Sequence, residues 1–144
     1  METATFIKSF RGNGIMLHKY LTNSEIAVVV FLTDFICYDD CVLRKNGDKR
    51  GKALTIQDLS DMYGVKYNTF RKTIYSLRDK EVIGSHETGN PEDGNKWITV
   101  NPYIFCRGIE ISKWVIDFYK DTMWAKIVRQ QIKDNAKTKE VCQC

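Results

Sequence analysis

The chain has 144 residues, of which 43% are hydrophobic and 28% are charged. These values are ordinary for a globular protein and leave room for one domain with a hydrophobic core, so they exclude a mostly disordered chain. The net charge of +4 permits nucleic acid as a partner without demonstrating it. Five cysteines are present and no signal-peptide pattern opens the sequence, so we expect free thiols and a cytoplasmic location.

Residues 1–20 predict an N-terminal arm or a short hairpin, because loosely alternating apolar residues lie on both sides of a Gly-Asn-Gly turn signal. Next, Thr22 and Glu25 have the spacing of a helix capping box. The apolar run from Ile26 to Cys37 follows this cap and predicts a buried core helix, which is too short to span a membrane. Its all-round apolar surface suggests that part of it meets another element or another subunit.

The loop of residues 44–52 contains five basic residues and one acid, a local charge of +4. Two hypotheses stay open for it: Lys49 and Arg50 follow the phosphates of a nucleic acid, or the loop is simply solvated. The Tyr38-Asp39-Asp40 sequence before it holds two carboxylates without a nearby third ligand, which favours a capped loop over a metal site.

Residues 54–80 predict two helices joined by a tight turn. Thr55 is the expected N-cap of the first helix and Asp58 its favourable third residue, while Gly64 suits a left-handed C-cap. The second helix is expected to begin near Tyr67 or Asn68 and to end near Lys80. A short Gly-containing turn between two helices is typical of a helix-turn-helix motif.

The second of these helices has one apolar face, formed by Phe70, Ile74 and Leu77 at helical spacing. Its opposite face carries amide, hydroxyl and cationic groups, which are the groups that base edges and phosphates accept. An ordinary solvated helix face is the alternative interpretation. The residues predicted to contact DNA are Lys66, Tyr67, Asn68, Thr69, Arg71, Lys72 and Tyr75, together with Lys49, Arg50 and Lys96 outside this helix.

A two-stranded ribbon is predicted after the second helix, with strands near residues 82–86 and 97–100. The loop between them consists of turn residues, and its acids Glu87, Glu92 and Asp93 would be repelled by phosphates. We therefore expect Lys96 and His86, at the base of this wing, to be better placed for DNA than the tip.

Residues 103–106 suggest a third strand, and the remaining chain returns to helical spacing. A helix over residues 111–120 is expected to place Ile111, Trp114, Val115 and Phe118 on one face, and a second helix is expected from Trp124 to Lys137. We interpret residues 109–137 as a C-terminal helical extension with a possible role in dimerisation and residues 138–144 as a disordered tail.

The sequence predicts no catalytic residues, no metal and no cofactor. Its two histidines are isolated, and it has no Gly-rich phosphate loop. Cys37 and Cys41 have the spacing of a zinc-binding pair, but Cys142 and Cys144, which would complete four thiolates, are too close together in sequence for a second pair. Cys37 is more simply a small buried apolar residue than a metal ligand. An enzyme is therefore not expected.

Three stretches resemble the RepL family of plasmid replication proteins: Leu54 to Ser60, Gly64 to Lys72 and Trp97 to Gly108, with Asn101-Pro102 and the residues after it the most specific part. The likeness also takes in the stretch from Leu21 to Ile26. The resemblance implies a winged-helix DNA-binding protein acting at a plasmid or phage replication origin. A phage-encoded transcription regulator on the same fold is the other possibility.

The expected fold is α+β but mainly α: a winged helix-turn-helix over residues 21–108 with added C-terminal helices. The expected function is sequence-specific binding of double-stranded DNA by a homodimer, in replication or transcription control, without a membrane. The alternative is a winged-helix interaction module that binds and modulates a host protein.

Overall fold

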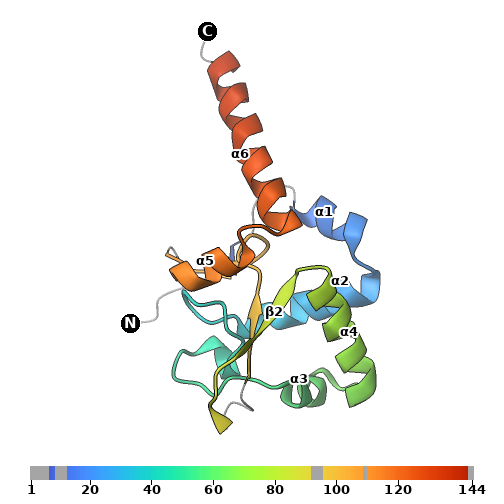
Figure 1. Ribbon diagram of the computed structural model, residues 1–144. Helices are drawn as coiled ribbons and strands as arrows, with labels where there is room; N and C mark the ends of the chain where they lie inside the picture. The colour runs from blue at the N-terminus through green and yellow to red at the C-terminus, as the bar shows by residue number, and fades with distance from the viewer. Residues whose placement is uncertain (1–6, 9–12, 92–95, 109, 143–144) are drawn as a thin grey trace.

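The computed structural model describes residues 7–8, 13–91, 96–108 and 110–142. In chain order these residues form β1 (Ile7–Lys8), α1 (Asn13–Tyr20), α2 (Asn23–Leu32), α3 (Ile56–Tyr63), α4 (Tyr67–Asp79), β2 (Ile83–Glu87), β3 (Lys96–Val100), β4 (Cys106–Arg107), α5 (Lys113–Tyr119) and α6 (Met123–Cys142). Figure 1 shows α2, α3 and α4 gathered beside the β2–β3 ribbon, α5 on its other side, and α6 extending away from the body.

The helix-turn-helix prediction is confirmed in its details. Thr55 accepts a hydrogen bond from the backbone N–H of Asp58, whose carboxylate in turn accepts from the Thr55 N–H, so the first helix begins with a complete capping box. Gly64 ends that helix with φ +84°, a left-handed conformation that favours glycine. The second helix, α4, begins at Tyr67 and ends at Asp79.

The wing prediction is also confirmed. Strands β2 and β3 pair antiparallel from Ile83 with Val100 to Glu87 with Lys96. On the other edge of β3, Val42 forms a bridge with Thr99, so the segment before the basic loop extends the ribbon. The molecule is therefore a mainly helical α+β protein with a winged helix-turn-helix and added C-terminal helices, as the sequence predicts. The predicted wing-tip acids Glu92 and Asp93 lie outside the described residues.

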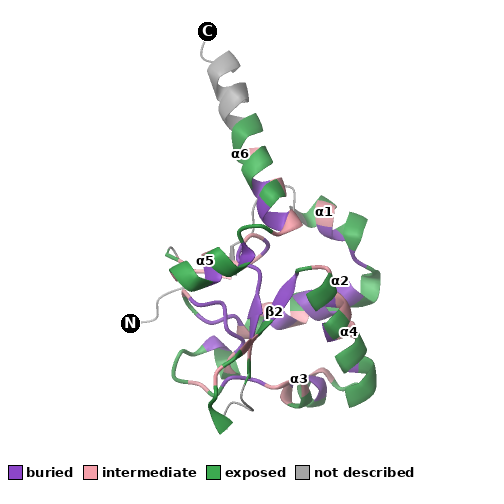
Figure 2. Cartoon of the chain, in the orientation of Figure 1, coloured by how far each residue is buried: buried purple, intermediate pink, exposed green. Residues whose placement is uncertain are grey.

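One hydrophobic core joins the three helices to the ribbon. Phe70, Ile74 and Leu77 of α4 are buried, as their helical spacing predicts, and they share this core with Leu32 of α2 and Leu59 of α3. Figure 2 shows the buried residues concentrated between the helices and the ribbon. Because this stripe faces inward, the opposite side of α4 faces solvent.

Two buried polar side chains fix the ends of these elements. Glu25, only 4% exposed, accepts hydrogen bonds at Oε1 from Lys80 Nζ (2.6 Å) and the Thr22 N–H (2.9 Å), and at Oε2 from Ser76 Oγ (2.6 Å). Burial raises the pKa of Glu25, but the hydrogen bonds from Lys80, Ser76 and Thr22 together outweigh burial and hold it at about 2. The carboxylate thereby ties the start of α2 to the last turn of α4.

Asn101, at the heart of the RepL-like stretch, is the second buried polar residue. Its amide nitrogen donates to the Glu81 carbonyl and to Thr122 Oγ1, and its side-chain oxygen accepts from the Tyr103 N–H. It therefore joins the end of β3 to the turn after α4 and to the segment before α6. The side chain turns the chain at residues 102–104, so the predicted strand over residues 103–106 is wrong except at Cys106, which belongs to β4.

The hairpin prediction is wrong for residues 13–20, which form α1. Leu17 is buried, as is Leu21 just after the helix. Residues four apart lie on the same face of a helix, so this segment faces the core as a helix although its apolar residues appear to alternate. Residues 9–12 lie outside the described part of the chain. Strand β1 pairs instead with the distant β4, with Ile7 opposite Arg107.

The predicted core helix ends earlier than expected. α2 stops at Leu32 and not at Cys37, because the backbone of Ile36 and Cys37 pairs with the segment at residues 42–43. The capping box at its start, between Thr22 and Glu25, is confirmed. Cys37 is fully buried, as predicted, and burial raises the pKa of its thiol.

The predicted apolar face of the C-terminal region is partly wrong. In α5, Val115 and Tyr119 point into the core, whereas Trp114 and Phe118 are 40% and 51% exposed. Tyr119 determines this rotation, because its buried hydroxyl bonds to the Thr99 hydroxyl at 2.6 Å. Trp124 is fully buried, and its ring N–H donates to the Lys80 carbonyl.

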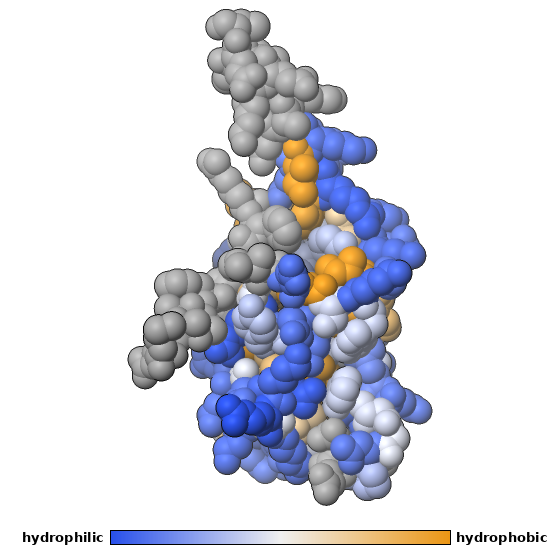
Figure 3. Space-filling view, turned by 90° about the vertical axis from the view of Figure 1, so that its left-hand side faces the viewer, coloured by the Kyte–Doolittle hydropathy of each residue, from blue (hydrophilic) through white to orange (hydrophobic). Residues whose placement is uncertain are grey.

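α6 continues to Cys142, beyond the predicted end at Lys137 and into the predicted disordered tail. The sequence from Thr138 to Cys142 contains no proline or glycine, so no residue stops the helix there. Figure 3 shows an apolar strip along α6 beside a largely hydrophilic face, and Ile132 of this helix is 56% exposed. Among the described helices, none combines the length and apolar character needed to cross a bilayer.

The Glu25 carboxylate predicts a pH-dependent stability. Its pKa is about 2 in the folded protein against 4.5 in the unfolded chain, so its contribution is present above pH 4.5 and is lost as pH falls toward 2. Glu25→Gln should lower the free energy of unfolding by roughly 3 kcal/mol at pH 7 and by little at pH 2. Urea denaturation between pH 2 and 7 measures this difference, with the exposed Glu110→Gln as control. Equal pH profiles for Glu25→Gln and the native chain would contradict the assignment.

Gly84 predicts a steric limit between the ribbon and α5. A Cβ at this position would lie 2.6 Å from Phe118 Cε1 and from the Tyr119 hydroxyl. Gly84→Val should therefore destabilise the fold by about 1–3 kcal/mol, because α5 must move off the ribbon. Gly14→Ala, where nothing lies within 4 Å of the new Cβ, is the matched control. Thermal unfolding at the same midpoint in both variants would refute the close contact.

Candidate nucleic-acid interface

The orientation of α4 is set from its two flanks. On one flank Ser76 bonds to Glu25 of α2, and at the helix start Phe70 packs on Tyr63 of α3 with ring centroids 5.6 Å apart. The other flank faces the ribbon, since Tyr75 and Arg78 line a groove together with Ile83 of β2. These contacts leave the side opposite Phe70 without a covering element among the described residues.

The structure brings most of the predicted DNA-contacting residues together on this uncovered side. Asn68, Lys72 and Tyr75 lie opposite Phe70, with Arg71 beside them toward the ribbon and Thr69 on the α2 flank. All seven predicted residues of the helix and its cap are exposed: Lys66, Tyr67, Asn68, Thr69, Arg71, Lys72 and Tyr75. Such a surface of amide, hydroxyl and cationic groups can hydrogen-bond to base edges and phosphates.

Alternating aromatic and guanidinium groups run along the ribbon-facing edge of α4. The Arg71 guanidinium lies 6.0 Å from the Tyr67 ring centroid and 5.5 Å from that of Tyr75, and the Arg78 guanidinium lies 4.7 Å from the Tyr75 ring. These separations fall within the range of cation–π contacts. These contacts restrain the long side chains of Arg71 and Arg78 and hold their positive charges along the ribbon-facing edge of α4.

Arg78 is not among the residues that the sequence predicts to contact DNA. The spacing of Tyr67, Arg71, Tyr75 and Arg78 was the available signal, because residues three and four apart are neighbours on a helix. Nothing in the spacing alone shows that this edge faces the ribbon.

A groove of about 310 Å³ separates α4 from the ribbon, and we call it the α4–ribbon groove. Its floor is apolar and includes Ile74, Ile83 and Ile98, all buried. Its rim carries Tyr67, Tyr75, Arg78, Ser85 and Lys96, and the described residues that line it include no aspartate or glutamate. The groove is therefore a positively charged, partly aromatic channel. Lys96, which the sequence predicts to contact DNA from outside α4, lines this groove together with Tyr67 and Tyr75 of α4.

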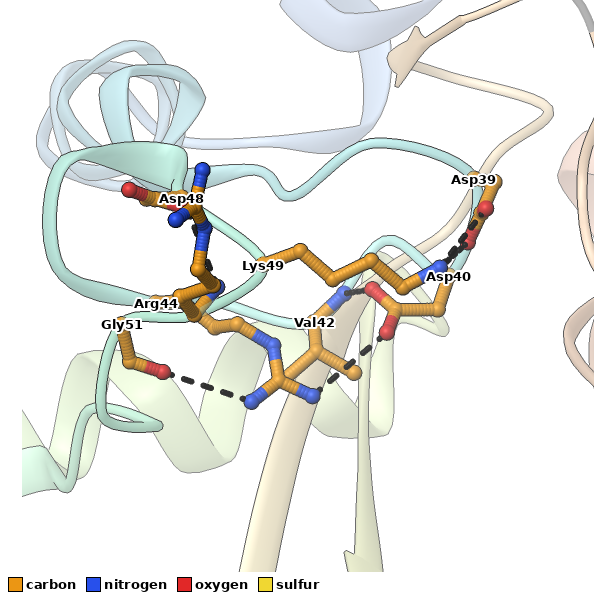
Figure 4. A network of polar contacts seen from close by, with 8 residues as sticks. Asp39, Asp40, Val42, Arg44, Asp48, Lys49 and Gly51 are labelled. Atoms are coloured by element: carbon orange, nitrogen blue, oxygen red, sulfur yellow. Dashed lines mark hydrogen bonds and ion pairs between the residues drawn. The ribbon is translucent and has the colours of Figure 1, made fainter.

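The basic loop lies across the ribbon from α4, after the segment that pairs with β3. Figure 4 shows that Lys49 points to Asp39, and its ammonium lies 3.0 and 2.8 Å from the two carboxylate oxygens. The bonded carboxylate raises the pKa of Lys49. Lys49 and Arg50 are both exposed, but a phosphate would have to displace the Asp39 carboxylate from Lys49, so Arg50 is the better placed of these two predicted contacts.

Arg44 in the same loop has a structural role. Its guanidinium lies 3.5 Å from the Asp40 carboxylate and 5.1 Å from the centroid of the Trp97 ring on β3. Asp40 also accepts a hydrogen bond from the Val42 N–H, so this carboxylate shapes the turn as the capped-loop interpretation predicts. The charges of the loop are thus partly neutralised within the protein.

The wing base combines a cation with a half-buried histidine. Lys96 is exposed and lies opposite Glu87 in the ribbon. His86 instead faces α5, bonds through Nε2 to Thr99 Oγ1 at 2.8 Å, and packs on Trp114 and Phe118. Burial lowers the pKa of His86, so its ring is neutral at pH 7 and contributes no charge to a DNA contact.

No metal-binding group of three or more His, Cys, Asp or Glu side chains occurs among the described residues. The side chain of Cys142 and the whole of Cys144, which the zinc hypothesis would need, lie outside that described part.

Comparisons with known proteins add little to this geometry. No protein-family model matches the chain, and no curated protein matches it. The resemblance to RepL therefore stays a prediction. Among solved structures, the chain is similar to a mutant of S. aureus MepR, with 14% identity and a TM-score of 0.41 over 92% of this chain and 72% of that one.

The exposed side of α4 should tolerate substitution without loss of the fold. Lys72→Ala and Asn68→Ala should each change the free energy of unfolding by less than about 0.5 kcal/mol, because neither side chain is buried. Ile74→Ala, three per cent exposed in the core, should cost about 2–5 kcal/mol. Urea denaturation compares the three variants, and a strongly destabilised Lys72→Ala would show that this side of α4 supports the fold.

Proposed function

We propose that the chain binds double-stranded DNA sequence-specifically by placing α4 in the major groove. The observation that carries the proposal is the uncovered side of α4, where Asn68, Lys72 and Arg71 stand away from the protein body. An amide can pair with adenine and a guanidinium with guanine, while a lysine at the same surface can reach a phosphate. Lys96 and Arg50 are proposed to contact the backbone on either side.

The biological setting belongs to the same proposal. In agreement with the RepL resemblance, we propose a cytoplasmic protein of plasmid or phage type that acts at a replication origin or at a transcription operator. Two copies bind together, because a two-fold protein matches the symmetric sites that helix-turn-helix proteins read. The exposed Ile132 on α6 supports a surface for the second copy.

The DNA-binding proposal is tested with a duplex selected by the protein from random sequences. Lys72→Ala should weaken binding to the selected and to unrelated duplexes alike and reduce the salt slope by about 1, because one phosphate contact is lost. Asn68→Ala should instead relax base discrimination at one position by about 1–3 kcal/mol. Fluorescence anisotropy at several salt concentrations measures both effects.

Lys19→Ala is the matched control, since it removes one exposed positive charge from α1 rather than from α4. It should bind the selected duplex as the native chain does. If Lys72→Ala and Asn68→Ala both retained native affinity and specificity, α4 would not be the reading helix.

The second candidate is an interaction module for a host protein. It is favoured by the half-exposed Trp114 and Phe118, which both pack on the His86 ring and present apolar surface beside the wing. Salt separates the two functions, because binding to phosphates falls steeply with ionic strength whereas an apolar protein contact does not. Capture of one stoichiometric host protein, without nucleic acid, would support this second function.

A further inference from the structure

We infer that the α4–ribbon groove binds an unpaired nucleotide of a single-stranded DNA segment, in addition to the duplex bound by the outer side of α4. The inference rests on the proposed function only for the identity of the polymer. It extends that function to DNA with an opened strand, which a duplex-reading helix does not by itself recognise.

The shape and the walls of the groove suit a nucleobase. The volume of about 310 Å³ lies at the lower end of the range of pockets that enclose small ligands. Ile74, Ile83 and Ile98 supply an apolar floor for a flat ring. Tyr67 and Tyr75, which are 38% and 39% exposed, stand at its edge, where a base can stack on them.

The charges of the groove suit a phosphate beside that base. Arg78 and Lys96 stand on opposite walls, one on α4 and the other on β3, and no acidic side chain lines the space between them among the described residues. Asp79 lies 3.9 Å from Arg78, and this exposed pair is weak. A ligand with one aromatic ring and one anionic group therefore meets a complementary surface, and a nucleotide combines both.

The tyrosines are held ready for stacking. Tyr75 contacts the guanidinium groups of Arg71 and Arg78, and Tyr67 contacts that of Arg71, so neither ring depends on the ligand for its position. Rings that are already positioned lose little conformational entropy when a base binds. Stacking on aromatic rings is tolerant of sequence, so this groove would add affinity for unpaired DNA without adding specificity.

The test compares a labelled 12-nucleotide thymidine strand with an abasic strand of the same length, which keeps the phosphates and lacks the bases. The native chain should bind the base-bearing strand about tenfold more tightly in fluorescence anisotropy, because base stacking is absent from the other strand. Equal affinity for the two strands would show that only phosphate attraction acts and would overturn the inference.

Variants locate the effect in the groove. Tyr67→Leu and Ser85→Trp, the second of which fills the groove from the exposed face of β2, should remove the preference for bases, whereas Tyr67→Phe should keep it. Circular dichroism and thermal unfolding confirm that each variant is folded. If folded Ser85→Trp and Tyr67→Leu kept the native preference, the bases would bind elsewhere and the inference would fail.

Two further measurements separate the possible results. Lys72→Ala, which lies outside the groove, should weaken duplex binding but keep the preference for bases over the abasic strand. Duplex binding without any base preference on single strands would overturn this inference and leave the proposed function intact. A base preference on single strands without duplex binding would support this inference and overturn the proposed function. Displacement of the strand by free thymidine monophosphate at equal concentration would identify a free nucleotide as the ligand and contradict the strand assignment.

Discussion

The buried carboxylate of Glu25 is the interaction on which the geometry of the interface depends. A carboxylate removed from water is costly unless its oxygens are satisfied, and here Thr22, Ser76 and Lys80 satisfy them. Ser76 and Lys80 belong to the last turn of α4 and to its cap, so the carboxylate constrains the rotation of α4 as well as its distance from α2. The apolar stripe alone would allow neighbouring rotations, because a stripe about one-third of the helix surface wide has no sharp edge.

That rotation assigns different surroundings to the three remaining sides of α4. Thr69 and Ser76 lie toward α2, Asn68 and Lys72 toward solvent, and Tyr67 and Arg78 toward the ribbon. The ribbon in turn is held from behind by α5, whose Tyr119 bonds to Thr99 and whose Phe118 fills the space at Gly84. The α4–ribbon groove is thus bounded by α4 and the ribbon, which are each fixed by buried contacts, and by residues 54–57 at the start of α3. Its shape therefore does not depend on a bound ligand.

Local patterns predicted the helix-turn-helix well, because caps and turns are decided by a few neighbouring residues. Thr55, Gly64 and the Phe70 stripe behave as their spacing predicts. Pairing that the helical periodicity does not reveal decided the rest: the Cys37 N–H donates to the Val42 carbonyl in place of a helix bond, and Tyr119 of α5 reaches the distant Thr99. The same limit applies to the interface, where the ion pair between Lys49 and Asp39 and the position of Arg78 beside the ribbon depend on tertiary contacts that no local spacing contains.

Chemical-shift mapping by NMR tests the central claim most directly. The backbone amides of the labelled protein are followed while a duplex selected from random sequences is added. The account predicts that the largest shifts occur at Asn68, Arg71, Lys72 and Tyr75, with smaller shifts at Lys96. Shifts confined to α5 and α6, with α4 unchanged at saturating duplex, would contradict it.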